Sequence, residues 1–418
     1  MINLLRNLQS RLLPHPTTHS EEAPTSTDIS FIEKSARANE IVPRVDINAF
    51  LRGTNCHVLV CPAGRVTLNV PKVMNGVIPD YKIQEPGGLP KKLPKFPNES
   101  TYPDLTISRM ENVLCIPGGV AISQNRYIIA ETFTCYWDRR FHQALIRSPK
   151  GYKLKEAPAT AKALSGKYLY LDFQHISHYG HFIADVLPRL WAYSYARNYL
   201  NIADLKIILT KKSEPFIHEL LTFFGFAKND IYEIDHPVMV EDLFIATKAL
   251  QLQDYVAPVL QETWKTISFR ATKSLIGAKR VYLSRARHPQ RILLNEIHVE
   301  QLFRAKGFEI VYPEELSISE QINTIIHSEM IAGTSGSNLF TLAFQQKLKS
   351  IFIITSPALI HITDSLLQVG RQCDLRTYIG EVAISHPSYD EHWVHSPWLI
   401  QDLGDLERAI GEWTEDFS

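Results

Sequence analysis

Positive charge gathers in the segment RVYLSRARHPQRILLNE, residues 280–296, between a strand-like apolar run and the expected start of a helix. Arg285 and Arg291 carry planar guanidinium groups, which can make paired hydrogen bonds to phosphate oxygens. Asn295 and Glu296 stand where the helix should begin, and a helix N-terminus adds partial positive charge. The segment therefore predicts a binding site for a diphosphate. The alternatives are an exposed basic loop, or arginines that pair with nearby acids.

A second loop, GTSGSN at residues 333–338, also lies between a strand-like run and a helix-like run. Its small residues would let a ligand approach the backbone closely, and its amides and hydroxyls can donate hydrogen bonds. We expect it to line the ligand pocket, or else to be a tight turn needed only for packing. The predicted contact residues are Gly333, Ser335, Gly336, Ser337 and Asn338.

The same loop is close to the Gly-x-Ser-x-Gly turn of α/β-hydrolases, with Ser335 as the nucleophile. Ser337 stands where that pattern has its second glycine, so the match is incomplete. A serine hydrolase also needs a histidine as base. The later candidates in this chain are His386, His392 and His395.

A third stretch, HISHYGHFIAD at residues 175–185, contains a candidate general base. His181 and Asp185 are four residues apart and would share one face of a helix. A carboxylate can fix the tautomer of an imidazole and increase its basicity, so either group could accept a proton. The alternative is a pair that only caps and orients the helix.

The histidines of this stretch also raise the question of a metal site, because His175, His178 and His181 are spaced by three residues. Gly180 and the loop-like context weaken that interpretation, and no Asp, Glu or Cys stands at ligand spacing. We therefore expect no metal ion and no cofactor.

Two series of alternating strands and helices must position these stretches, one from Lys167 and one from about Lys279. Such alternation predicts parallel sheets with crossover helices, and Pro188 should kink the helix that begins near His181. The expected fold is α/β, with a β-rich N-terminal region and two Rossmann-like domains. A ligand would lie in the cleft between these domains, at the carboxyl ends of the strands.

The domain boundaries follow from this pattern. We predict an N-terminal tail with an amphipathic segment over residues 1–40 and an N-terminal Rossmann-like domain over 41–260. A C-terminal Rossmann-like domain, which binds the nucleotide, should cover 261–390, followed by a tail or helix over 391–418.

Composition narrows the class of protein. Among 418 residues, 44 are Lys or Arg and 44 are Asp or Glu, a balance that argues against a general nucleic-acid binder. Five scattered cysteines without finger spacing indicate a reducing, cytoplasmic setting rather than a disulfide scaffold. No apolar run approaches the roughly 20 residues of a membrane-spanning helix.

The N-terminal segment MINLLRNLQSRLLPHP has leucines at helical spacing, two arginines and no acid. It predicts either a peripheral contact with a membrane surface or a transit peptide. The alternative is a frayed helix that packs on its own protein. A homo-oligomer is left open by the sequence.

Taken together, the three stretches resemble glycosyltransferase family 61. Its Tyr-x-His-Phe/Trp-x-x-Asp-x-x-Pro-Arg pattern appears as YGHFIADVLPRL, and its Ser-Arg-x(5)-Arg-x-x-x-Asn-Glu pattern as SRARHPQRILLNE. GFEIVYPEELSISEQI resembles a third family segment, and the similarity covers about residues 125 to 355. One departure is clear: the family loop Gly-x-His-Gly-Ala-Gly-Leu reads GTSGSNL here, so Ser335 replaces a histidine.

The resemblance implies a GT-B-like fold and an inverting, metal-independent transfer from a nucleotide-sugar donor. No Asp-x-Asp pair occurs in the chain, so arginines would neutralise the departing diphosphate in place of a metal ion. Asp185, slightly favoured, or His181 would take the proton of the acceptor hydroxyl, and Glu296 would hold ribose or sugar hydroxyls. Ser335 to Asn338 would line the donor pocket.

The resulting hypothesis is a hexosyl- or pentosyltransferase that acts on a saccharide or glycolipid acceptor. It would work in the cytoplasm, or as a peripheral protein at the inner face of the membrane, in capsular or lipopolysaccharide synthesis. The rival hypotheses are a serine hydrolase that uses Ser335, and an inactive binding protein of glycosyltransferase shape.

Overall fold

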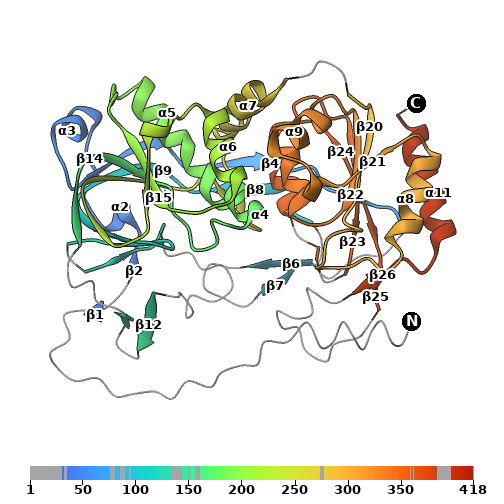
Figure 1. Ribbon diagram of the computed structural model, residues 1–418, viewed down its shortest axis with the longest axis horizontal. Helices are drawn as coiled ribbons and strands as arrows, with labels where there is room; N and C mark the ends of the chain where they lie inside the picture. The colour runs from blue at the N-terminus through green and yellow to red at the C-terminus, as the bar shows by residue number, and fades with distance from the viewer. Residues whose placement is uncertain are drawn as a thin grey trace.

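The computed structural model describes residues 31–32, 35–75, 81–84, 90–93, 96–124, 126–132, 144–148, 151–155, 161–273, 277–357, 359–360, 362–383 and 397–417. Two large sheets lie toward opposite ends of the long axis, with helices between and around them (Figure 1). Both sheets contain parallel strands joined by helices, so the predicted α/β class is confirmed. The amphipathic N-terminal segment, Cys135 and the three candidate hydrolase histidines lie outside the described residues.

The sheet of the first half has the strand order β16-β15-β14-β17-β9-β10-β11-β2, and β3 also pairs with β9. Its strands are β2 (Ser35–Ala36), β3 (Cys56–Cys61), β9 (Leu105–Ile116), β10 (Val120–Ile122), β11 (Ile128–Ile129), β14 (Lys162–Tyr170), β15 (Lys206–Thr210), β16 (Ile231–Ile234) and β17 (Val238–Ala246). The four strands from β16 to β17 are parallel, whereas β17 and β9 are antiparallel. From β14 the chain adds strands first on one side and then, with β17, on the other. The carboxyl ends of β14 and β17 therefore form a switch point, where α/β folds bind ligands.

The sheet of the second half is parallel, with the order β21-β20-β22-β23-β24-β5. Its strands are β5 (Lys72–Val73), β20 (Arg280–Leu283), β21 (Glu309–Val311), β22 (Met330–Thr334), β23 (Ser350–Thr355) and β24 (Asp374–Ile379). From β20 the chain adds β21 on one side and then β22, β23 and β24 on the other. The carboxyl ends of β20 and β22 form the second switch point.

Short strand pairs surround these sheets. They are β1 (Phe31–Ile32) with β12 (Leu145–Ser148) and β13 (Gly151–Leu154), β4 (Gly64–Thr67) with β8 (Glu99–Tyr102), β6 (Tyr81–Gln84) with β7 (Pro90–Leu93), β18 (Leu250–Gln251) with β19 (Tyr255–Val256), and β25 (Glu381–Val382) with β26 (Trp398–Leu399). The N-terminal region is therefore β-rich, as predicted.

The helices follow the same division into halves. The first half contains α2 (Ala38–Ile41), α3 (Ile47–Arg52), α4 (Tyr179–His181), the π-helix η1 (Phe182–Val186), the 3-10 helices η2 (Leu187–Arg189) and η3 (Lys228–Asp230), α5 (Leu190–Asn198), α6 (Pro215–Phe224) and α7 (Leu260–Ala271). The second half contains α8 (Glu296–Ala305), α9 (Ile318–Ile326), α10 (Thr363–Leu366), α11 (Leu403–Glu415) and the 3-10 helices η4 (Pro313–Glu315) and η5 (Ser337–Phe344). None of the described helices is long and apolar enough to cross a membrane.

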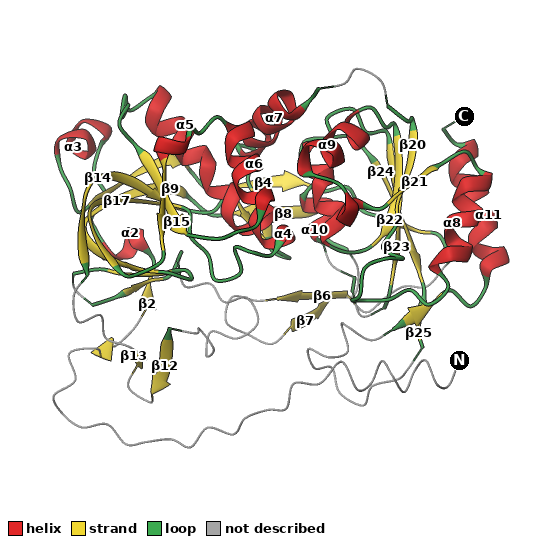
Figure 2. Cartoon of the chain, in the orientation of Figure 1, coloured by secondary structure: helices red, strands yellow, loops and turns green. Residues whose placement is uncertain are grey.

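The two halves pack together through their helices, which lie between the sheets (Figure 2). Phe182 of η1 and Leu220 of α6 belong to the same buried apolar cluster as Ile322 of α9 and Phe344 of η5. Burying each such side chain contributes about 1.5–3 kcal/mol, so this shared core holds the halves against each other.

Two connections cross the predicted domain boundaries, which themselves remain predictions. β5, from the N-terminal region, pairs with β24 through Lys72 and Val73, so the second sheet is completed by residues far outside 261–390. Toward the C-terminus, Trp413 of α11 packs on Phe352 of β23, with ring centroids 5.1 Å apart. Residues 398–417 are thus part of the second half rather than a loose tail.

The segment after β14 is not one kinked helix but a series of short ones: α4, η1, η2 and α5. Pro188 has no N–H to continue an α-helical ladder, and the chain passes through a π-helix and a 3-10 helix before α5 begins. Segments of π-helix are frequent at functional sites.

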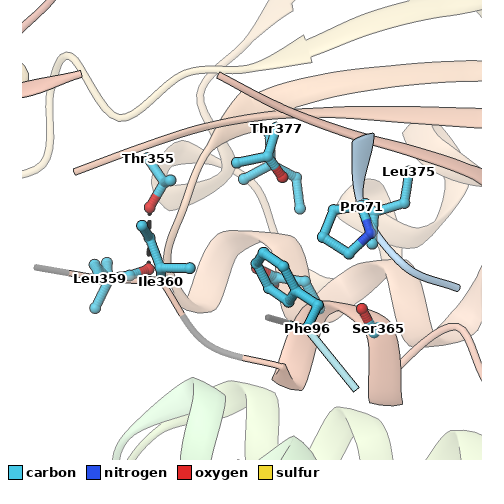
Figure 3. A pocket seen from close by; sticks show the side chains of 10 residues that line it. Pro71, Phe96, Thr355, Leu359, Ile360, Ser365, Leu375 and Thr377 are labelled. Carbon is cyan, nitrogen blue, oxygen red and sulfur yellow. Dashed lines mark hydrogen bonds between the residues drawn. The ribbon is translucent and has the colours of Figure 1, made fainter. Parts of the chain in front are cut away.

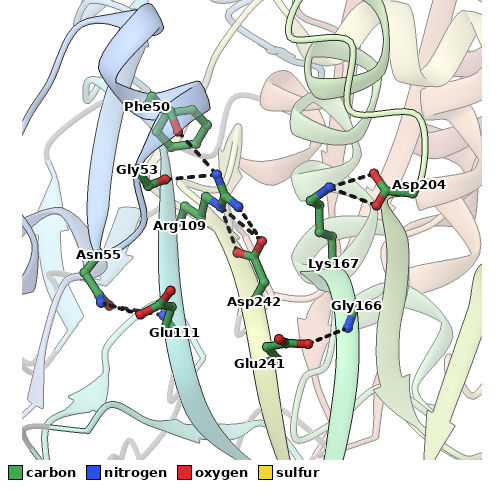
Figure 4. A network of polar contacts seen from close by, with 10 residues as sticks. All are labelled: Phe50, Gly53, Asn55, Arg109, Glu111, Gly166, Lys167, Asp204, Glu241 and Asp242. Carbon is green, nitrogen blue, oxygen red and sulfur yellow. Dashed lines mark hydrogen bonds and ion pairs between the residues drawn. The ribbon is translucent and has the colours of Figure 1, made fainter.

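An ionic network links the end of α3 to strands β9 and β17 of the first sheet (Figure 4). Arg109 of β9 donates to Asp242 of β17, at 2.7 Å, and to the carbonyl oxygen of Gly53 at 2.9 Å. Lys167 of β14 makes a separate, more exposed pair with Asp204 at 2.8 Å. These contacts are distant in sequence and serve to position the strands.

Candidate active site

The arginine-rich segment leaves the carboxyl end of β20 and reaches α8, at the switch point of the second sheet. Arg285 is 7% exposed, and its guanidinium donates to Asn338 Oδ1 at 3.4 Å and to the carbonyl oxygen of Gln290 at 3.3 Å. Arg291 is partly buried in the same loop and has a left-handed backbone, with φ of 56°. Both predicted diphosphate ligands are therefore at the place where α/β folds bind anions.

Neither of these arginines forms an ion pair with a carboxylate within the described ranges. The Nε atoms of both Arg285 and Arg291 are buried without a hydrogen-bond partner there. Burial lowers the pKa of Arg285, and burial together with repulsion from Arg285 lowers the pKa of Arg291 to about 10. Arg287 differs, because it is exposed and pairs with Glu315. The alternative of arginines paired with nearby acids fits Arg287 but not Arg285 or Arg291.

Glu296 starts α8 as predicted, but its carboxylate faces the protein. It is 3% exposed, and its Oε1 accepts hydrogen bonds from the backbone N–H of Arg285 at 2.8 Å and from Tyr282 at 3.2 Å. Ser284 and Thr334 donate to the same oxygen at 3.4 and 3.3 Å. Through Oε1, Glu296 anchors the backbone of Arg285, and its contact with ribose or sugar hydroxyls stays a prediction.

Asn295 is an anchor as well. Its side-chain amide donates to the carbonyl oxygen of Ile400 at 2.8 Å and accepts from the N–H of Ile400 at 3.1 Å. Beside it, Trp398 Nε1 donates to the carbonyl oxygen of Arg291 at 3.3 Å, and the N–H of Leu294 donates to Trp398. The segment around Trp398 therefore holds the backbone of the arginine loop, a contact that no local pattern predicts.

The loop GTSGSN follows β22 and meets the arginine loop directly. A Cβ atom at Gly336 would lie 2.9 Å from Nη1 of Arg285, so only glycine allows this approach. Asn338 accepts from Arg285 and donates to the carbonyl oxygen of Thr334 at 3.3 Å. At Gly333, a Cβ atom would lie 2.8 Å from the carbonyl oxygen of Leu283, so this glycine serves strand packing.

Ser335 is 3% exposed, and its hydroxyl donates to the carbonyl oxygen of Leu359 at 3.5 Å. Thr355, at the end of β23, donates to the same oxygen at 3.0 Å, so Leu359 ties the loops after β22 and β23 together. Figure 3 shows Thr355 and Leu359 on the wall of a small pocket that also includes Thr377. A buried hydroxyl engaged in this way does not favour Ser335 as a nucleophile.

His181 and Asp185 form the predicted pair across α4 and η1. Nδ1 of His181 lies 2.9 Å from Oδ2 of Asp185, and Asp185 is completely buried. An ionised carboxylate only accepts hydrogen bonds, so Nδ1 carries the proton and the lone pair of the imidazole lies on Nε2. His181 rather than Asp185 is then suited to accept a proton from a substrate.

The second oxygen of Asp185 is bound by Lys248, which sequence analysis missed. Lys248 Nζ lies 2.7 Å from Asp185 Oδ1, and its side chain is 5% exposed. Burial alone would raise the pKa of Asp185, but Lys248 and His181 outweigh it and hold that pKa well below its usual range. Lys248 follows β17, 63 residues away from Asp185. In the sequence, the only indication of this role is that Lys248 stands among apolar residues at the end of an expected strand.

The first and second halves meet at these loops. A Cβ atom at Gly180 would lie 2.8 Å from Cβ of Ser337, and the hydroxyls of Tyr179 and Thr341 are 2.6 Å apart. Burial is the main cause that lowers the pKa of His178 to about 4, and electrostatic interaction with neighbouring histidines and with both loop arginines contributes. The three stretches identified in the sequence therefore converge on one site.

The rings of the three histidines pack against one another. The ring centroids of His178 and His181 are 5.0 Å apart, and those of His175 and His181 are 5.4 Å apart. His178 Nδ1 accepts from the backbone N–H of His181 at 3.4 Å and so caps α4. No group of three or more His, Cys, Asp or Glu side chains that could hold a metal ion occurs among the residues the structure describes.

Comparison with known protein families finds a match over part of the chain. Residues 179–352 match the family Glycosyltransferase 61, a range that contains the pair His181–Asp185, the arginine loop and the loop GTSGSN. The match supports a glycosyltransferase of this family. No curated protein matches the chain.

Proposed function

We propose that the protein is an inverting, metal-independent glycosyltransferase that uses a nucleotide-sugar donor and has a GT-B-like arrangement of its two halves. One observation carries the proposal: Arg285, which is buried, and Arg291, which is partly buried, lie together at a switch point, and neither forms an ion pair with a carboxylate of the described residues. Buried guanidinium groups are unfavourable unless an anion neutralises them, and the diphosphate of a nucleotide sugar supplies that charge.

In the proposed reaction each side of the site would have its own role. Arg285 and Arg291 would bind the diphosphate and stabilise the charge that develops on it as the bond to the anomeric carbon breaks. The acceptor hydroxyl would attack that carbon from the opposite side and form the new glycosidic bond with inversion. Nε2 of His181 would take the proton of the hydroxyl, while Asp185 stabilises the imidazolium that results.

Ser335 stands where the resembled family has a histidine, and its hydroxyl contacts Leu359. The phosphate contact expected of that histidine would therefore fall to the arginines and to the backbone around Gly336. The resemblance of the sequence motifs supports a saccharide or glycolipid acceptor. It also supports a hexose or pentose donor sugar, work at the cytoplasmic side of a membrane, and surface polysaccharide synthesis.

A thermal-shift panel of nucleotides and nucleotide sugars tests the donor site first, because a ligand that binds the folded state raises the melting temperature. We expect the sugar nucleotides of one base to stabilise the protein, and the best of them to be hydrolysed slowly or transferred to saccharide acceptors. Stabilisation without hydrolysis or transfer would identify an inactive binding protein. The absence of any stabilisation, with labelling of Ser335 by a fluorophosphonate, would identify a hydrolase.

A further inference from the structure

The carboxylate of Asp185 is shared between two partners, the ammonium group of Lys248 and the imidazole of His181. Its Oδ1 contacts Nζ of Lys248 at 2.7 Å, and its Oδ2 contacts Nδ1 of His181 at 2.9 Å. Both Asp185 and Lys248 are almost completely shielded from water, with 0% and 5% of their side chains exposed. In such surroundings each charge acts strongly on its neighbours.

Lys248 is held in this place by contacts on several sides. The hydroxyl of Tyr255 donates to its carbonyl oxygen at 3.2 Å, and the next residue, Ala249, donates its N–H to Pro188 at 2.9 Å. The ammonium group also lies 5.9 Å from the ring centroid of Phe173. Its position is therefore set by β17, η2 and the loop after β14 together.

We propose that Lys248 is a positioning residue for the base of the proposed transfer reaction. It offsets the charge of Asp185, so that the carboxylate stabilises a protonated His181 less strongly, and it fixes which oxygen of Asp185 faces Nδ1. The inference rests on the proposed function, in which Nε2 of His181 accepts the proton of the acceptor hydroxyl.

The physical reason is the balance of charge. A buried aspartate that has only an imidazole as partner stabilises the imidazolium, and a protonated His181 cannot act as base. With Lys248 in contact, the aspartate and lysine form a pair without net charge. Asp185 can still orient the imidazole through its hydrogen bond with Nδ1–H. It stabilises the protonated form of the ring less than an unpaired carboxylate would.

Other charged groups surround the pair and would remain in any variant. Arg189 donates to the carbonyl oxygen of Asp185 at 2.6 Å and to that of Glu131 at 2.6 Å. The charged or titratable groups that face the pair and the imidazole are Arg189, Glu131, Asp254, His175 and His178. Burial lowers the pKa of Lys248, but the attraction of Asp185 opposes that shift.

The test is the pH dependence of transfer by Lys248→Met, which keeps the length of the side chain and removes its charge. At neutral pH we expect kcat to fall by about tenfold or more, but by no more than the roughly 10²–10⁴-fold that a general base contributes. The rate should recover as the pH rises, because the acid limb of the profile moves to higher pH. Lys248→Arg should keep a profile close to that of the unaltered protein, and the affinity for the donor should change little in either variant.

Lys167→Met is the matched control, since Lys167 also pairs with an aspartate, Asp204, but lies away from the site. It should leave the pH profile unchanged. A Lys248→Met protein that melts earlier yet keeps both the rate per folded molecule and the shape of the profile would show a merely structural role and overturn the inference.

A second measurement does not depend on any transfer activity. NMR titration of labelled histidines in the full chain should show that His181 keeps its proton to higher pH in Lys248→Met than in the unaltered protein. If Lys248→Met does not fold, the double variant Asp185→Asn with Lys248→Met removes both buried charges. In that variant His181 should lose its proton at lower pH than in the unaltered protein.

An unmoved titration of His181 would overturn the inference even if the protein proves to be an active transferase. A moved titration in a protein without transferase activity would refute the proposed function alone.

Discussion

Arg291 lies close enough to Arg285 that, after burial, repulsion between the two guanidinium groups is the next cause that lowers its pKa, to about 10. Like charges in a partly buried loop oppose folding unless something neutralises them. No carboxylate of the described residues forms an ion pair with either arginine, and Oε1 of Glu296 accepts instead from the backbone N–H of Arg285 and from the hydroxyl of Tyr282. The diphosphate of the proposed donor would supply the neutralising charge.

Arg291→Met and Arg285→Met should each weaken the affinity for the best nucleotide sugar by about 1.5–3 kcal/mol, the usual value of a hydrogen bond to a charged group. Arg291→Met should also raise the melting temperature of the ligand-free protein, because one of two repelling charges is removed. Isothermal titration calorimetry and thermal unfolding on the same samples measure both effects.

Arg287→Met is the control from the same loop. Arg287 is exposed, pairs with Glu315 and stacks 3.7 Å from the ring centroid of Tyr312, so its loss should leave the affinity unchanged. Equal losses of affinity in all three variants would point to a general electrostatic effect and contradict a specific diphosphate site.

Much of the site could be predicted because its signals are local. The spacing of His181 and Asp185 predicts contact on one helical turn, and the structure confirms it at 2.9 Å. The arginine loop could be placed at a strand end because the alternation of strands and helices is regular. Both predictions depend only on residues that are near in sequence.

What could not be predicted depends on contacts between distant segments. Lys248, which follows β17, contacts Asp185 in η1. Trp398 donates to the carbonyl oxygen of Arg291, which is 107 residues away in sequence. A glutamate at a helix start usually faces solvent or a ligand, so nothing local indicates that Glu296 turns inward to Arg285. The pairing of β5 with β24 is equally non-local.

His181→Gln should lower kcat by about 10²–10⁴-fold while sparing donor affinity, because it removes the proposed base but not the diphosphate site. Asp185→Asn should cost a similar factor, and the double variant little more, since residues that act as a unit are not additive. Steady-state kinetics per folded molecule measure these effects. Full activity of folded His181→Gln would exclude the assignment of the base.

Stability should separate the two single variants. Asp185→Asn leaves the buried Lys248 without its carboxylate, and losing one member of a buried pair costs about 3–5 kcal/mol. His181 is partly exposed, with 14% of its side chain accessible, so His181→Gln should destabilise far less. Chemical denaturation of both proteins would reveal the difference, and equal destabilisation would contradict the ion pair seen here.

Chelation should not abolish transfer. In the proposed function Arg285 and Arg291 neutralise the diphosphate in place of a metal ion, and no suitable group of His, Cys, Asp or Glu ligands occurs in the described part of the chain. Transfer rates should be equal in excess EDTA and in magnesium or manganese salts. If EDTA abolishes activity and a divalent ion restores it, a metal site at His175, His178 and His181 would be supported instead.

Donor affinity should depend on pH through Glu296. Burial raises the pKa of this carboxyl from its ordinary value of 4.5 to about 7, although the N–H of Arg285 and other donors oppose the shift. The folded chain therefore holds a proton on Glu296 at pH values where the unfolded chain has lost it. That contribution to stability is complete below about pH 4.5 and is lost as the pH rises through about 7.

The same proton changes the charge beside Arg285. When Glu296 ionises, its negative charge offsets part of the positive potential of the arginine loop, so the affinity for an anionic donor should fall as the pH rises from about 6 to about 8. Glu296→Gln resembles the protonated form and should bind the donor with an affinity that is nearly independent of pH. A nucleotide sugar is the right probe, because its diphosphate does not titrate in this range.

Glu300→Gln, one turn further along α8 and equally buried, is the matched control and should retain the pH dependence of the unaltered protein. If affinity in the unaltered protein does not change across this range, or if Glu300→Gln abolishes the dependence while Glu296→Gln does not, Glu296 does not tune the charge of the donor site.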